Sequence, residues 1–216
     1  MLFSFFQYLA AVVSLGLLKI FTRLEIHGQE NLRELQKPFI VVSNHESHLD
    51  PQLVGVALLG SPKHFPVRYM AKNTLFWIPG LNLLIWLLGA FMAHKKKGIE
   101  RSLWTPLKIL KNNGAVIMFP EGRMIIERPK LGEGRRGAAM LALMTGSAIL
   151  PMSIHTPHDL PPIIPLTTHR PDVAIRIGEP FYLNNLDYPD LSDENTYKAT
   201  QVIMQKIADL YFQHRY

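Results

Sequence analysis

Short apolar segments that end in polar or Pro-containing loops recur along this chain, and they constrain its fold more than any other feature. The clearest segment, 39–42, is followed by a polar stretch and then by Pro51, a residue that favours the first turn of a helix. Similar segments alternate with helical patterns along the rest of the chain. The sequence therefore predicts one α/β domain in which helices flank a mostly parallel, mixed sheet. We expect strands at 24–28, 39–43, 67–71, 89–94, 115–119, 148–154 and 173–178, and helices at 2–20, 51–59, 81–88, 100–111, 136–144 and from 192 onward.

His45 and Asp50 follow the segment 39–42 in sequence. An extended chain would hold them about 17 Å apart and a continuous helix would turn them about 140° from each other, so they can meet only across a turn. The residue before a proline is disfavoured in the α region, which makes Asp50 a predicted N-cap of the helix that begins at Pro51. We therefore expect the Asp50 carboxylate to fold back toward His45.

An imidazole beside a carboxylate suits general-base catalysis on an alcohol. A histidine is partly neutral near pH 7 and can take the proton of an attacking hydroxyl, while the carboxylate fixes its tautomer and stabilises the imidazolium. A single His-x4-Asp pattern also arises by chance in loops, so a second motif has to support this interpretation. The alternative chemistry is a metallohydrolase with His45, His48 and Asp50 as ligands, for which the sequence offers no fourth ligand pattern.

A second polar loop, Pro120-Glu121-Gly122-Arg123, follows the apolar pattern at 115–119. Together the two stretches resemble the glycerophospholipid acyltransferases, of which bacterial 1-acylglycerol-3-phosphate acyltransferase is typical. The blocks that match that family are Asn44-His45-x-Ser47-x-Leu49-Asp50, Phe119-Pro120-Glu121-Gly122 and Ile149-Leu150-Pro151-Met152. They stand in the family's order and spacing, and the resemblance covers nearly the whole chain.

The resemblance implies an enzyme that moves a fatty acyl group from an acyl thioester to the free hydroxyl of 1-acylglycerol-3-phosphate, giving phosphatidic acid in phospholipid biosynthesis. It makes His45 the base and Asp50 its orienting partner, with no acyl-enzyme intermediate because a thioester is already activated. The implied donor is acyl-CoA or acyl-carrier protein, and the chemistry requires neither a cofactor nor a metal. The predicted substrate-binding residues are Asn44, Ser47, Lys72, His94, Glu121, Gly122 and Arg123.

Two departures from the family pattern leave the head group of the acceptor open. Most members that act on the phosphate-bearing acceptor have a Thr between the residues equivalent to Gly122 and Arg123. Here the Arg follows directly, as it does in enzymes that reacylate other lysophospholipids such as lysophosphatidylethanolamine. The family's Arg at the end of a later strand is His94 in this chain, and Lys95-Lys96-Lys97 follow it, so phosphate binding there is either supplied by lysine or weakened.

The amino-acid composition favours an enzyme that acts at a membrane surface. Of the 216 residues 48% are hydrophobic, and the net charge of +6 favours anionic partners such as phospholipid or a CoA phosphate, while no nucleic-acid motif is evident. Residues 2–20 are apolar and marginally long enough to span a bilayer, and Trp77, Leu84 and Trp86 can add a second apolar surface. We expect a membrane-associated N-terminal helix at 1–22 and the acyltransferase domain at 23–216.

The absence of Cys fits a reducing compartment, so we expect a membrane-associated protein whose active site faces the cytoplasm. The alternatives are a core helix at 2–20, ordinary core around Trp77 and Trp86, and a membrane-binding module without catalysis.

The pattern Gly132-x-Gly134-x-x-Gly137 has the letters of a dinucleotide-binding loop, but the residues before it form a poor strand. We expect instead a loop that leads into the helix at 136–144. We expect the basic side chains in and near this loop to lie either close to the phosphates of the acyl donor or in solvent. These residues are Arg128, Lys130, Arg135 and Arg136. Five histidines are predicted to lie in loops or on the surface: His27, His155, His158, His169 and His214.

Overall fold

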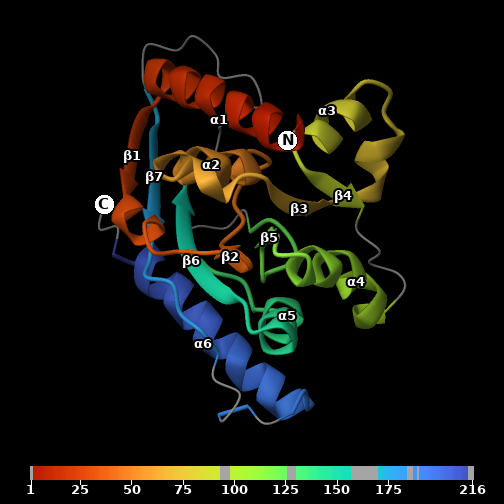
Figure 1. Ribbon diagram of the computed structural model, residues 1–216. Coiled ribbons are helices and arrows are strands. Elements are labelled where there is room, and N and C mark those ends of the chain that lie inside the picture. Colours follow the sequence, from red (N-terminus) through yellow and green to blue (C-terminus); the bar gives the residue numbers. More distant parts are fainter. Residues whose placement is uncertain are drawn as a thin grey trace.

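The computed structural model describes residues 2–92, 98–125, 130–156, 170–183, 187–188 and 190–213. Within them lies a seven-stranded sheet of order β1-β7-β6-β2-β5-β3-β4, shown in Figure 1. Neighbouring strands are parallel except for β6 and β7, which are antiparallel. The strands are β1 Arg23–His27, β2 Phe39–Ser43, β3 Val67–Ala71, β4 Ala90–Met92, β5 Ala115–Met118, β6 Ala148–His155 and β7 Asp172–Ile177. The predicted mostly parallel, mixed α/β sheet is confirmed.

Helices cover both faces of this sheet, and the side chains of β2 alternate between the two layers. Phe39 and Val41 pack into a cluster with residues of the first two helices, whereas Ile40 and Val42 pack against the three helices on the other face. All four side chains are fully buried, as expected for the central strand of a parallel sheet. The helices are α1 Leu2–Phe21, α2 Asp50–Ala57, α3 Leu81–Leu87, α4 Gly98–Lys111, α5 Gly137–Thr145 and α6 Asp193–Tyr211, with 3-10 turns at Gln29–Leu32, Leu58–Gly60, Pro62–His64 and Asn73–Trp77.

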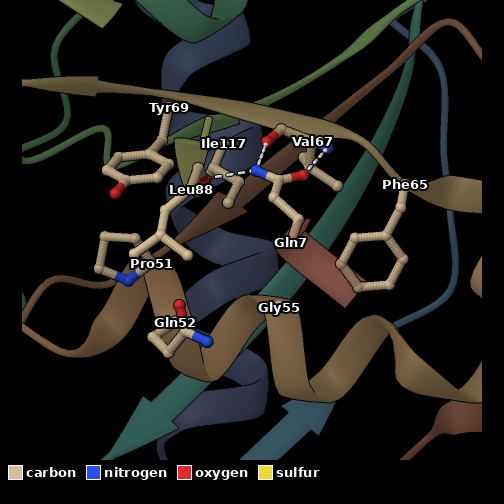
Figure 2. A pocket seen from close by; sticks show the side chains of 9 residues that line it. All are labelled: Gln7, Pro51, Gln52, Gly55, Phe65, Val67, Tyr69, Leu88 and Ile117. Carbon is tan, nitrogen blue, oxygen red and sulfur yellow. Dashed lines mark hydrogen bonds between the residues drawn. The ribbon is translucent and has the colours of Figure 1, made fainter. Parts of the chain in front are cut away.

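The N-terminal helix α1 lies across α2 (Figure 1), and the buried side chain of Gln7 joins it to β3 and to the end of α3. The amide nitrogen of Gln7 donates hydrogen bonds to the carbonyl oxygens of Val67 and Leu88, and its oxygen accepts one from the Val67 N–H at 2.9 Å (Figure 2). Gln7 thereby lines a small cavity between α2 and β3. Further along the helix, Ala11 and Leu18 are buried in the core. One side of α1 is therefore part of the packed domain.

The other side of α1 is apolar and exposed, at Phe5, Leu9, Val13, Leu17 and Ile20. By length and composition, α1 is the one helix within the described residues that is apolar enough to cross a membrane. Exposed apolar side chains also gather on α3 and the turn before it, and those residues are Trp77, Ile78, Leu83, Leu84 and Trp86. Figure 1 shows α3 beside the N-terminal end of α1.

Candidate active site

The predicted meeting of His45 and Asp50 occurs at the carboxyl end of β2. Residues 44–49, which we call the His45 loop, leave β2 and turn into α2 at Asp50. The Asp50 carboxylate is fully buried, and its Oδ2 atom lies 2.8 Å from Nδ1 of His45. A carboxylate only accepts hydrogen bonds, so in the neutral imidazole Nδ1 carries the proton and Nε2 has the lone pair. The imidazole is partly exposed and stacks on the ring of Phe119, with centroids 4.3 Å apart.

Asp50 was predicted to be the N-cap of α2, and this detail is wrong. The N-cap position is occupied by Leu49, while Asp50 is the first helical residue. Its carboxylate turns back to the His45 loop, where Oδ2 accepts from the N–H groups of Glu46 at 2.7 Å and Ser47 at 2.9 Å. Its Oδ1 atom accepts from the Ser47 hydroxyl at 2.6 Å. The oxygens that would have capped the helix are used by the loop, and this fixes the loop around the carboxylate.

Two neighbouring segments hold the His45 loop on the sheet. The Asn44 side chain donates to the Ile154 carbonyl at 2.7 Å and accepts from the Ile154 N–H at 2.8 Å, so it continues the pairing between β2 and β6. On the other side, the His45 N–H donates to Glu121 at 2.9 Å, and the His45 carbonyl accepts from the Ile125 N–H at 2.8 Å. The loop after β5 therefore supports His45 through its main chain.

Glu121 and Gly122, both predicted to bind substrate, shape this second loop. The Glu121 side chain is buried, and its other oxygen accepts from the Gly132 N–H at 2.8 Å. Burial raises the pKa of the Glu121 carboxyl, while the N–H groups of Gly132 and His45 act in the opposite direction. Gly122 has a φ of +67°, and a Cβ atom there would lie 2.7 Å from Nε of Arg135. The positive φ favours glycine at this position.

A cleft of about 730 Å³ opens beside this loop and is lined by several basic side chains. Arg123, Lys130 and Arg135 all line it, together with Glu121 and Glu133. Arg123 is exposed and, among the residues that the structure describes, it forms no ion pair. The cleft therefore presents a guanidinium whose donors are available to an anionic ligand.

The glycines at 132 and 134 serve close packing within the described part of the chain. A Cβ atom at Gly132 would lie 2.8 Å from Cδ1 of Ile125, and one at Gly134 would lie 2.4 Å from Cγ of Met204. Residues 130–136 form a loop that leads into α5, as predicted, and the helix begins at Gly137, one residue later than expected. Arg128 lies outside the described residues, and Arg136 pairs with Asp193 at the start of α6.

Of the other predicted site residues, one is exposed and one lies outside the described ranges. Lys72 is exposed at the end of β3, and His94 lies outside the described residues. His48 is exposed, and among the described residues no three His, Cys, Asp or Glu side chains are placed to hold a metal ion together. His45, His48 and Asp50 therefore form no metal site in this part of the chain.

Sequence reasoning misplaced one buried histidine and missed one buried carboxylate near the site. His155 was expected in a loop or on the surface, but β6 extends to this residue, which is buried with its ring stacked on Tyr211. Glu46 is also buried and accepts a hydrogen bond from the Tyr211 hydroxyl. No local pattern predicts this contact, because the two residues are 165 positions apart. His27 is exposed as expected, while His158, His169 and His214 lie outside the described residues.

Comparison with known proteins agrees with this geometry. The chain is 26% identical over 188 residues to the 1-acyl-sn-glycerol-3-phosphate acyltransferase of Bacillus subtilis, covering 87% of each chain. It is 27% identical to the enzyme of the same name from Streptococcus pneumoniae, covering 88% of this chain and 67% of that one. The crystal structure of the 1-acyl-sn-glycerophosphate acyltransferase PlsC from Thermotoga maritima matches with a TM-score of 0.66 and 26% identity, over 91% of this chain and 74% of that one. Residues 23–155 match the Acyltransferase family model, so the chain belongs to the Acyltransferase family.

Proposed function

We propose that this protein transfers a fatty acyl group from an acyl thioester to the free hydroxyl of 1-acylglycerol-3-phosphate, giving phosphatidic acid. The observation that carries the proposal is the His45 imidazole, which Asp50 holds through Nδ1 and which keeps Nε2 available. Glu121, which accepts a hydrogen bond from the His45 N–H, lines the cationic cleft. The bacterial relatives and the Thermotoga protein are named as acyltransferases for this acceptor, which supports the choice.

In the proposed reaction, Nε2 of His45 takes the proton of the acceptor hydroxyl as its oxygen attacks the thioester carbonyl. The tetrahedral intermediate then collapses, the carbon–sulfur bond breaks, and the leaving thiolate receives the proton from the imidazolium. Asp50 keeps the ring in the required tautomer and stabilises its positive charge. Ser47 is not the nucleophile in this scheme, because its hydroxyl is directed to Asp50.

The acceptor's phosphate is proposed to lie in the cleft beside Glu121. Arg123 offers a planar fork that can bind two phosphate oxygens, and Lys130 and Arg135 add positive charge to the same cleft. Lys72 and His94 remain predicted contacts at the rim, and Asn44 acts through the loop that it anchors to β6.

We further propose that the protein works on a membrane surface from its cytoplasmic side, with residues 1–22 as the membrane-associated segment and 23–216 as the acyltransferase domain. The exposed apolar side chains of α1 and of α3 support this placement, as does the net charge of +6. The proposed donor is acyl-CoA or acyl-carrier protein, with no additional cofactor.

The proposal is tested by a product assay with the purified protein and mixed vesicles. Vesicles that contain either 1-acylglycerol-3-phosphate or lysophosphatidylethanolamine are incubated with acyl-CoA or with acyl-carrier protein, and the lipids are identified by mass spectrometry. We expect phosphatidic acid, and we expect His45→Ala to lower turnover by at least about a hundredfold. Near-normal turnover in a folded His45→Ala variant would refute the mechanism. Acylation of lysophosphatidylethanolamine alone would refute the acceptor.

A further inference from the structure

A buried carboxylate next to the catalytic histidine connects the His45 loop to the last helix of the domain. Only 7% of Glu46 is exposed, although its side chain carries a carboxylate. One oxygen accepts a hydrogen bond of 2.7 Å from the Tyr211 hydroxyl, and the other accepts from the Thr156 N–H at 3.2 Å. Burying a carboxylate is costly unless hydrogen bonds replace its hydration, so these partners are needed to keep Glu46 inside.

The Tyr211 hydroxyl is itself held in one place by the packing of its ring. Tyr211 is 1% exposed near the end of α6, and its ring stacks on His155 with centroids 4.3 Å apart and planes inclined by 21°. The ring of Phe212 meets it edge-on at 5.1 Å. A side chain that is packed on both sides has little rotational freedom, which makes its hydroxyl a fixed donor.

Movement of Glu46 would be transmitted directly to the catalytic pair. The main-chain N–H of Glu46 donates to the same Asp50 oxygen that binds the His45 imidazole. A shift of residue 46 would therefore lengthen a bond to Asp50 and move the neighbouring residue 45 at the same time. Asn44 and Glu121 restrain the loop from β6 and from the loop after β5, whereas Glu46 restrains it from α6.

We propose that the hydrogen bond from Tyr211 to Glu46 holds the His45 loop in its catalytic geometry, so that both are positioning residues for acyl transfer. This inference rests on the proposed function. Tyr211 lies beyond residues 23–155, the part of the chain that the family model matches, so α6 adds a restraint from outside the matched region.

The test removes the hydroxyl and keeps the ring. Tyr211→Phe is compared with Tyr197→Phe, a matched change on the exposed side of the same helix, with 1-acylglycerol-3-phosphate as acceptor and the donor that the wild type accepts. We expect Tyr211→Phe to lower kcat about tenfold with both KM values within about twofold, because a misplacement of about 1 Å can cost about a hundredfold in rate. Tyr197→Phe should match the wild type.

A second variant isolates the bond from general destabilisation. Glu46→Leu removes the acceptor, and in that background Tyr211→Phe should lower kcat no further, since the bond is already lost. All rates are measured per folded molecule, well below each melting temperature. If Tyr211→Phe leaves kcat unchanged, or if kcat and both KM values change together with Tm, Tyr211 only stabilises the fold and the inference is wrong.

A readout that needs no turnover separates this inference from the proposed function. The proton on Nδ1 of His45 is assigned in the NMR spectrum from its disappearance in His45→Ala. We expect its resonance to shift in Tyr211→Phe and to stay in place in Tyr197→Phe, whatever lipid the enzyme uses. If the resonance does not move in Tyr211→Phe, the inference is wrong. If it moves in Tyr211→Phe but the wild type forms no phosphatidic acid, only the proposed function is wrong.

Discussion

Asp50 concentrates the hydrogen bonds of the His45 loop on one buried carboxylate. The imidazole and the N–H groups of Glu46 and Ser47 all donate to Oδ2, and the Ser47 hydroxyl donates to Oδ1. The same group therefore orients the proposed base and determines the shape of the loop. Substitutions that spare the carboxylate should be tolerated far better than those that remove it.

Comparing Ser47→Ala with Asp50→Asn tests this difference. Ser47→Ala removes the hydrogen bond to Asp50 and the one that the hydroxyl accepts from the Leu49 N–H, but it leaves the main-chain donors to Asp50 in place. We therefore expect the activation free energy to rise by about 1 kcal/mol, which lowers kcat roughly fivefold. Asp50→Asn changes the acceptor that fixes the imidazole tautomer, and we expect turnover to fall by at least about a hundredfold. If Ser47→Ala abolishes turnover and an acyl-enzyme accumulates in the wild type, Ser47 is the nucleophile and the direct transfer is wrong.

Arg123→Ala tests the proposed phosphate contact. We expect KM for the acceptor to rise by about 10- to 150-fold, because about 1.5 to 3 kcal/mol of charge-assisted hydrogen bonding is lost, with little change in KM for the donor. Arg123→Lys should recover only part of the affinity, since it keeps the charge and loses the fork. Arg101→Ala, on the exposed side of α4, is the matched control. Equal increases in both KM values with a lowered Tm would mean that Arg123 supports the loop instead.

Glu121 gives a dependence of stability on pH with a definite sign. Burial raises the pKa of its carboxyl, so the folded state binds the proton more tightly than the unfolded chain does. The contribution of Glu121 to stability is then present below its ordinary pKa and is lost as the pH rises through the raised pKa. Glu121→Gln removes this titration. Its Tm relative to the wild type should therefore rise as the pH increases above the ordinary carboxyl pKa, as thermal melts can measure. A difference in Tm that stays constant with pH would contradict the prediction.

At the scale of elements, β2, β3 and the start of the last helix could be predicted closely from the sequence. The apolar runs at 39–43 and 67–71 are bounded by turn residues, and Ser192 caps α6 by accepting from the Asn195 N–H. The side chain that joins α1 to the domain could not be predicted. Gln7 looks like a polar interruption of an apolar helix, and its partners Val67 and Leu88 lie 60 and 81 positions away.

Gln7→Leu tests whether α1 belongs to the packed domain. The change leaves the N–H and carbonyl of Val67 and the carbonyl of Leu88 without their partner, so we expect a loss of about 1 to 3 kcal/mol in the free energy of unfolding. Gln201→Leu, at an exposed position of α6, should change it by less than about 0.5 kcal/mol. Equal melting temperatures for the two variants would show that Gln7 does not hold the helix. Deletion of residues 1–22 should lower Tm further, because it also removes Ala11 and Leu18 from the core.

At the scale of the whole molecule, exposed apolar side chains are frequent on α1 and around α3, and Figure 1 shows α3 beside the N-terminal end of α1. The first two family blocks follow β2 and β5, parallel neighbours whose carboxyl ends lie at the same edge of the sheet, and the third block lies within β6. The first block contains His45 and Asp50, and the structure brings these two side chains together as predicted. The family blocks could not predict how α6 reaches that edge, since the contact between Glu46 and Tyr211 depends on the packing of the complete domain.

Trp77→Ala should weaken binding to anionic phospholipid vesicles. Trp77 is 79% exposed in the turn before α3, and losing its transfer into the membrane interface should cost about 1 to 2 kcal/mol of binding free energy in a vesicle sedimentation assay. Trp104→Ala is the matched control, because Trp104 is 69% exposed on α4. Equal loss of binding in both variants would place the membrane contact elsewhere on the surface.

The central position of β2 has a consequence for the synthesis of the chain. Both neighbours of this strand are encoded much later, and Asn44 and its partner Ile154 are 110 positions apart. At about 5 to 20 residues per second, the ribosome needs about 5 to 20 s to pass from one to the other. Throughout that interval, the uncharged, β-forming segment from Phe39 to Val42 has no strand to pair with. Exposed segments of this kind can pair with one another between nascent chains and cause aggregation. Slow translation would prolong this exposure, so the yield of soluble protein should depend more on chaperone supply than on the stability of the finished fold.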